Sequence, residues 1–124
     1  MVDQEEQQET FEKHLRISRE FLSKAEQELE QGDHLQASEK FWGASAHMVK
    51  ALASRRGWEH RSHAALYQVI NRLASETGDE ELRDLFLAAG QLHTNFYEEL
   101  LPLEMVQRGG QRVKELVARL EQVL

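Results

Sequence analysis

Apolar residues recur along this chain at spacings of three and four, the period of an amphipathic α-helix, in five successive stretches. No stretch alternates with the period of two that a half-buried β-strand would show. The apolar rows span Phe11 to Leu29, Ala37 to Ala53, His63 to Ala74, Leu82 to Leu100, and Val106 to Leu124. The second row covers most of its helix circumference, which predicts a central helix with neighbours on two sides.

A glycine followed by a capping residue separates the first three of these stretches. Gly32 ends the first helix, after which Asp33 caps the second helix, with Gln36 completing a capping box. Gly57 and Ser62 give the same stop and cap before the third helix. The apolar row of that third helix is predicted to face inward, His63 and Tyr67 included, and so is the next row, from Leu82 to Leu100.

The same signal recurs at Gly78 and Asp79, before the fourth helix. Pro102 ends the fourth helix and suits the first turn of a fifth. Gly109 and Gly110 either allow close backbone approach or loosen that last helix. Five helices joined by short connections predict an all-α fold, an up-and-down antiparallel bundle of four to five helices.

Length and composition predict one domain, spanning residues 1–124. The chain contains no cysteine, which excludes disulfides and thiolate metal ligands and leaves stability to a single packed core. Residues 1–10 are mostly polar, and we expect them either to fray or to continue the first helix. The chain begins without the layout of a secretory signal, and its apolar runs are too short to span a bilayer. We therefore expect a cytoplasmic protein without membrane association.

The net charge of -7 argues against general nucleic-acid binding, which needs a basic surface. The charge is uneven, because residues 1–31 carry a net -5, residues 32–77 a net +2, and residues 78–124 a net -4. The basic excess in the middle includes the stretch SRRGWEHRSH at residues 54–63. Any site for an anion is expected there.

Two interpretations of this basic stretch follow from the residues themselves. In the first, Arg55 and Arg56 complement the dipole at the end of the second helix, and the stretch is structural. In the second, basic side chains at one end of the bundle, with the N-terminal amides of the third helix, bind a phosphate, another anion or an acidic partner protein. The residues of this second interpretation are Lys50, Arg55, Arg56, His60 and Arg61.

Two histidine–tyrosine pairs lie at helical spacing. His63 and Tyr67 share a face of the third helix, and His93 and Tyr97 share a face of the fourth. The two pairs are expected to meet across the bundle, most simply as hydrogen-bonded core residues.

A metal site is a further alternative for the histidines. His60, His63 and His93 with Glu59 are the residues that would build it, but the chain has no paired-ligand motif such as HExxH. Glu98 and Glu99 are adjacent and point in different directions, so they do not form a carboxylate pair for acid and base chemistry. We therefore expect no metal and no cofactor.

Two stretches, GDHLQASEKFWGA (residues 32–44) and LHTNFYE (residues 92–98), carry a family resemblance. Together with the helices around them, over roughly residues 20–120, the chain resembles the PaREP family of small helical proteins, which is placed with or near the HEPN superfamily. The resemblance implies a HEPN-like bundle that acts as a noncatalytic binding or interaction module. It also implies a homodimer, and a nucleotide, RNA or a small nucleotidyltransferase as the ligand or partner.

The resemblance implies one enzymatic alternative, a metal-independent ribonuclease. Its signature is an arginine followed after four to six residues by a histidine, where the histidine transfers the proton and the arginine stabilises the phosphate charge. Arg55 with His60, and Arg56 with His63, have this spacing. Chance alone predicts about 1.5 such pairs in this composition. In the ribonucleases the motif lies near the last long helix rather than after the second, so we favour the noncatalytic module.

Overall fold

The computed structural model describes residues 3–124, and the regular structure in them is entirely helical, which confirms the predicted all-α fold. The Asp3 carboxylate accepts the Glu6 N–H at 2.8 Å and caps the first helix, so residues 4–10 continue that helix, which is one of the two outcomes expected for this segment. Residues 1–2 lie outside the described part of the chain. The helices are α1 (Gln4–Glu30), α2 (His34–Arg56), α3 (His63–Thr77), α4 (Glu81–Glu98) and α5 (Leu103–Glu121).

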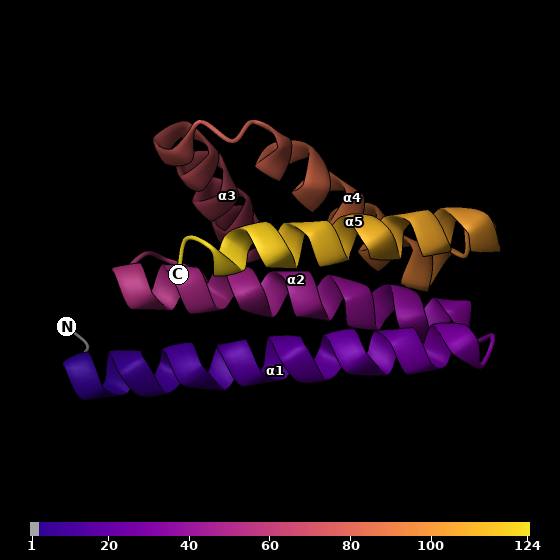
Figure 1. Cartoon of the computed structure of the whole chain (residues 1–124), viewed down its shortest axis with the longest axis horizontal. Coiled ribbons are helices and arrows are strands. Elements are labelled where there is room, and N and C mark those ends of the chain that lie inside the picture. Colours follow the sequence, from indigo (N-terminus) through magenta and orange to yellow (C-terminus); the bar gives the residue numbers. More distant parts are fainter. Residues whose placement is uncertain (1–2) are drawn as a thin grey trace.

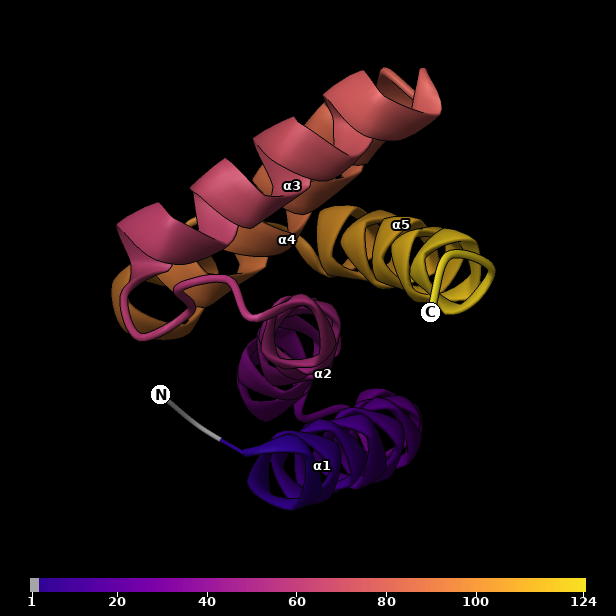
Figure 2. The same ribbon diagram turned by 90° about the vertical axis from the view of Figure 1, so that its left-hand side faces the viewer.

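The five helices form a bundle around α2 (Figures 1 and 2). α1 lies along one side of α2, α5 lies along the other, and the α3–α4 pair crosses obliquely above them. α2 contacts each of the other four helices, and its interface with α1 is the most extensive. The start of α1 and the ends of α2 and α5 lie at the same end of the bundle (Figure 1).

The core lies mainly between α2 and the three helices that follow it. Its largest fully buried side chains are Phe41, Phe86, Met48, Leu52, Leu66, Ile70, Leu73, Leu82, Leu85, Leu92, Leu116 and Leu120. The opposite face of α2 packs against α1. Gly43 on this face lies against Phe21 of α1, and His47 is hydrogen-bonded to His14 of α1.

The two glycines of α5 permit close approach to the core. A Cβ atom on Gly110 would lie 2.6 Å from Cζ of Phe41, and one on Gly109 would lie 2.8 Å from Cδ2 of Leu92. Real Cβ atoms do not come so close to neighbouring carbons, and Phe41 is fully enclosed. Of the two roles open to these glycines in the sequence, the structure supports close approach.

Most of the predicted caps are present. The Asp33 carboxylate accepts the Gln36 N–H at 3.2 Å, and the Ser62 hydroxyl accepts the Ala65 N–H at 3.0 Å. Gly57 and Gly78 end α2 and α3 in the left-handed region, with φ of 74° and 76°. Pro102 lies at the N-cap of α5.

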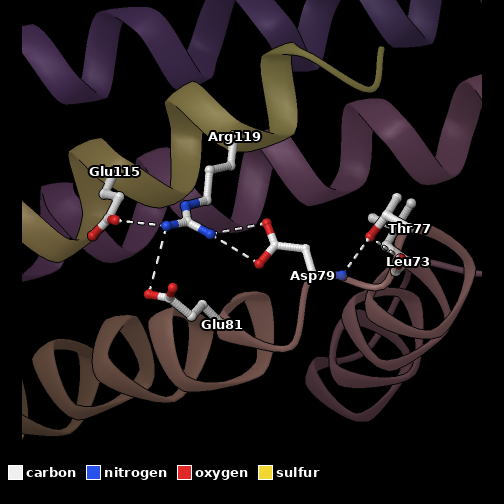
Figure 3. A network of polar contacts seen from close by, with 6 residues as sticks. All are labelled: Leu73, Thr77, Asp79, Glu81, Glu115 and Arg119. Atoms are coloured by element: carbon white, nitrogen blue, oxygen red, sulfur yellow. Dashed lines mark hydrogen bonds and ion pairs between the residues drawn. The ribbon is translucent and has the colours of Figure 1, made fainter.

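Asp79 does not cap α4, contrary to the prediction, because its carboxylate binds Arg119 of α5 instead (Figure 3). Nη1 of Arg119 donates to both Asp79 oxygens, at 2.8 and 3.0 Å, and Nη2 donates to Glu115 at 2.9 Å. The Asp79 N–H donates to the Thr77 hydroxyl at 3.2 Å. The hydrogen bonds that Arg119 donates to Asp79, followed by the one that it donates to Glu115, raise the pKa of Arg119. This network joins the α3–α4 turn to α5.

Two further predictions about side-chain direction were wrong. His63 and Tyr67 are exposed rather than part of the inner row of α3, which consists of Leu66, Val69, Ile70, Leu73 and Ala74. Leu100 is also exposed, because α4 ends at Glu98 and Glu99 then adopts a left-handed φ of 51° before Pro102 is reached. None of the described helices is long and apolar enough to cross a membrane.

Candidate functional site

The connection between α2 and α3, residues 57–62, is held by its own polar groups. The Glu59 carboxylate accepts the backbone N–H groups of His60 at 3.0 Å and Arg61 at 2.8 Å. The bond from the Arg61 amide is the main cause of a lowered pKa at Glu59. The Ser62 hydroxyl accepts the Ala65 N–H. The amides of His60, Arg61 and Ala65 are therefore already bonded within the chain and are not available to an anion at this end of α3.

A cavity of about 770 Å³ opens between this connection and the first turns of α1, within the size range of small-molecule sites. Its lining includes Gln7 and Thr10 from α1, Ser54 from α2, and His60 and Arg61 from the connection. His60 has a fixed orientation, because its Nδ1–H donates to the Trp58 carbonyl at 2.9 Å. The lone pair of the neutral ring then lies on Nε2.

The other predicted anion-binding residues are placed around this cavity in three different ways. Arg55 stacks on Phe11, 4.7 Å from the ring centre, and lines a second cavity of about 330 Å³ that shares Gln7 with the first. Arg56 instead pairs with Glu76 at 3.3 Å and donates to the Val123 carbonyl. Lys50 lies near the histidines of the α1–α2 interface. The structure thus brings Arg55, His60 and Arg61 to neighbouring cavities and directs Arg56 elsewhere.

A histidine pair that no sequence motif indicated lies beside this cavity. Nδ1 of His14 and Nδ1 of His47 are 2.9 Å apart, and the His60 ring is 5.9 Å from that of His14. A hydrogen bond between two imidazole nitrogens requires one protonated and one unprotonated nitrogen. Burial, followed by the charge of His47, lowers the pKa of His14 to about 4. Burial, followed by the charge of Lys50, lowers that of His47 to about 4.

We expect this pair to make the fold sensitive to acid. The unfolded chain binds protons at these histidines below pH 6.5 and the folded chain does so only near pH 4, so the free energy of unfolding should decrease as the pH falls through this window. The stabilisation is fully present above pH 6.5. Both rings are partly exposed, so the expected loss is about 1–2 kcal/mol. Urea unfolding across this pH range measures it.

A matched pair of variants separates this effect from general acid destabilisation. The double variant His14→Gln/His47→Gln should lose most of the difference in stability between the two ends of the window, whereas His34→Gln should retain it. A pH dependence that is unchanged in the double variant would show that the pair does not titrate as the structure implies.

A second cluster lies where α3 and α4 pack against α2. Nδ1 of His93 is 2.8 Å from Oε1 of Glu39, and the His93 ring stacks on Trp42 with centres 5.1 Å apart. The rings of His63 and Tyr97 each meet His93 edge-on, at 5.2 and 5.3 Å.

The predicted histidine–tyrosine pairs are rearranged in this cluster. His63 and His93 meet as expected, and Tyr97 lies against His93. Tyr67 instead packs on Phe86, with ring centres 4.8 Å apart. In the part of the chain that the structure describes, no hydrogen bond joins a histidine to a tyrosine, so the partner of His93 is the carboxylate of Glu39.

The two stretches that carry the family resemblance meet at this cluster. Glu39 and Trp42 belong to the stretch at residues 32–44, and His93 belongs to the stretch at residues 92–98. A second contact joins the same two stretches, since Asn95 Nδ2 donates to the Ser38 hydroxyl at 3.0 Å, and Asn95 Oδ1 accepts the Leu101 N–H at 2.7 Å. Asn95 is fully buried. The most distinctive parts of the sequence are thus joined by polar contacts between α2 and α4.

Comparisons with known proteins agree with the fold and with the resemblance to the PaREP family. A crystal structure of a protein from Sulfolobus solfataricus has a similar fold, with a TM-score of 0.77 over 86% of this chain and 94% of that one, at 23% identity. No curated protein matches the chain. The sequence of residues 13–117 matches the archaeal PaREP1/PaREP8 family, which spans most of the length. This protein therefore belongs to the archaeal PaREP1/PaREP8 family.

Proposed function

We propose that the protein is a noncatalytic binding module of the HEPN-like type, and that it binds a phosphate-bearing ligand, a nucleotide or RNA, in the cavity beside the α2–α3 connection. The observation that carries this proposal is the convergence of Arg55, His60 and Arg61 on two neighbouring cavities that share Gln7. Arginine forks match phosphate oxygens, and such charge-assisted hydrogen bonds are stronger than neutral ones.

The charge distribution supports an anionic ligand at this position. The protein as a whole carries -7, so most of its surface repels a polyanion. Lys13 and Lys50 lie close enough to the His14–His47 pair to lower its pKa values, which adds positive potential beside the cavity. A ligand with one or a few phosphates suits this local potential better than a long nucleic acid, which would meet the acidic surfaces.

The proposed HEPN-like type also implies protein partners. We propose that the protein forms a homodimer or binds a small nucleotidyltransferase. Large apolar side chains around the α4–α5 turn remain exposed and would give such a partner apolar surface to bury. They are Tyr97, Leu100, Leu103 and Met105.

Calorimetric titration with ATP and with a short RNA at two salt concentrations tests the binding proposal. We expect binding that weakens with salt, and a loss of about tenfold in affinity for each of Arg55→Ala and Arg61→Ala, from the charge-assisted bonds removed. Arg108→Ala removes the same charge from an exposed position of α5 and should leave the affinity nearly unchanged. Full ATP and RNA binding by an Arg55→Ala/Arg61→Ala double variant would overturn the proposal.

One observation favours a second candidate, the metal-independent ribonuclease. His60 is held by the Trp58 carbonyl with Nε2 left to accept a proton, which suits a general base, and Arg55 lines the adjoining cavity. Arg56 and His63 do not share such an arrangement, since Arg56 binds Glu76 and His63 lies on Trp42 and His93. The same RNA, incubated with a chelator, separates the two functions: cleavage that His60→Ala abolishes would assign the enzyme, and intact RNA supports the module.

A further inference from the structure

The cluster of Glu39, Trp42, His63 and His93 plays no part in the proposed function. Its polar groups come from three helices, and its two imidazole rings are nearly perpendicular, with centres 5.2 Å apart. His93 has one ring nitrogen bonded to a carboxylate, and no hydrogen bond occupies the ring nitrogens of exposed His63 within the described residues. We propose that His63 and His93 bind a divalent transition-metal ion, of the class of Zn²⁺ or Ni²⁺.

The bond between Glu39 and His93 is the arrangement that a metal-binding imidazole requires. Metal-bound histidines almost always donate the second ring N–H to a carboxylate, carbonyl or water, which fixes the ring and makes the binding nitrogen more basic. Here Nδ1–H of His93 donates to Oε1 of Glu39 at 2.8 Å, so the lone pair lies on Nε2. Trp42, itself buried, stacks on the ring at 28° and holds its orientation.

The spacing of the two rings fits coordination of a single ion. At Zn–N distances of about 2.0–2.1 Å and a tetrahedral angle, two imidazole ring centres lie about 5 Å apart. The centres of His63 and His93 are 5.2 Å apart with an interplanar angle of 83°. His63 is exposed at the first position of α3, so its side chain has room to turn a nitrogen towards the ion.

Charge distinguishes this pair from the other histidine pair. The ring centres of His14 and His47 are 5.1 Å apart, a similar spacing. The positive charges of Lys13 and Lys50 lie near both of these rings, however, and disfavour the binding of a metal cation there. His93 instead contacts the Glu39 carboxylate, whose negative charge favours the binding of a metal cation. We therefore expect metal binding at His63 and His93 and none at His14 and His47, so each pair serves as the control for the other.

The site offers two protein ligands. The described residues contain no group of three or more histidine or carboxylate side chains placed to hold a metal, and the combination of His60, His63, His93 and Glu59 is not assembled, since Glu59 binds loop amides. Water would complete the coordination shell. The ion would therefore be accessible to a further ligand, in contrast to a closed structural zinc site.

Calorimetric titration with Zn²⁺ alone, on the full chain, tests the proposal. We expect one ion per chain, with affinity lowered at least tenfold by His63→Ala or His93→Ala and ten- to a hundredfold by Glu39→Gln, which removes the carboxylate charge beside His93 and weakens the bond that orients its ring. His14→Ala/His47→Ala should bind Zn²⁺ as well as the unmodified protein. Because His63 is exposed, His63→Ala should keep its fold, which circular dichroism checks.

Two spectroscopic measurements locate the ion. In a Trp58→Phe background, Ni²⁺ should quench Trp42 fluorescence, and the quenching should disappear with His63→Ala. Nitrogen-15 spectra should show Zn²⁺ on Nε2 of His93 while Nδ1 keeps its proton. The proposal is overturned if the unmodified protein shows no saturable Zn²⁺ binding, if binding persists in His63→Ala/His93→Ala, or if His14→Ala/His47→Ala abolishes it.

Discussion

Phe41→Ala should lower the free energy of unfolding by about 3–5 kcal/mol, the usual cost of removing a buried phenylalanine and leaving a cavity. Phe41 is 1% exposed and fills the space that the missing side chain of Gly110 leaves between α2 and α5. A glycine in a helix cannot compensate for the loss, because it has no side chain to move into the cavity. Urea or thermal unfolding measures the change, on the condition that the transition is two-state.

Two variants frame this result. Leu87→Ala removes an apolar side chain of similar type that is 56% exposed, and it should change stability by less than about 0.5 kcal/mol. Phe41→Leu keeps much of the volume and should cost clearly less than alanine. If Phe41→Ala cost no more than Leu87→Ala, the packing of α5 against α2 described above would be wrong.

Asn95→Ala should lower the free energy of unfolding by about 1–3 kcal/mol, because it leaves buried polar partners without a hydrogen bond. Asn95 is fully buried, and it bridges the Ser38 hydroxyl on α2 and the Leu101 N–H in the α4–α5 turn. The turn should loosen as well, and faster hydrogen exchange at the Leu101 amide would show it.

The neighbouring residue provides the control. Thr94 is exposed, and its hydroxyl donates to the Gly90 carbonyl one turn earlier on the same helix, so Thr94→Ala should be nearly neutral. Equal effects of Asn95→Ala and Thr94→Ala, or an unaltered Leu101 amide in Asn95→Ala, would contradict the bridging role.

The fold was predictable because its signals are local. Gly57 with Ser62 and Gly32 with Asp33 act within one helical turn, and each capped or stopped a helix as expected. Asp79 has the same local sequence but meets Arg119, forty positions away, and the stronger charge-assisted bond wins over capping. The exposure of His63 was not predicted either. An apolar row does not indicate at which residue of a helix the coverage by a neighbouring helix begins.

The candidate sites were predictable only in part. The basic residues after α2 stood out as a run in the sequence, and three of them do line neighbouring cavities. The pairs His14–His47 and Glu39–His93 join residues 33 and 54 positions apart, and their meeting depends on how each helix is rotated about its axis. Period and composition leave that rotation open for polar residues at the edge of an apolar row.

The short connection between α1 and α2 bears on the order in which the chain folds. Residues 31–33 alone separate the two helices, so the most extensive helix pair is also made from neighbouring segments. Closing so small a loop costs little chain entropy, and folding rates rise as native contacts become more local in sequence. α5, by contrast, must return to α2 after α3 and α4. We therefore expect the first two helices to form the folding nucleus, and the last helix to complete the bundle.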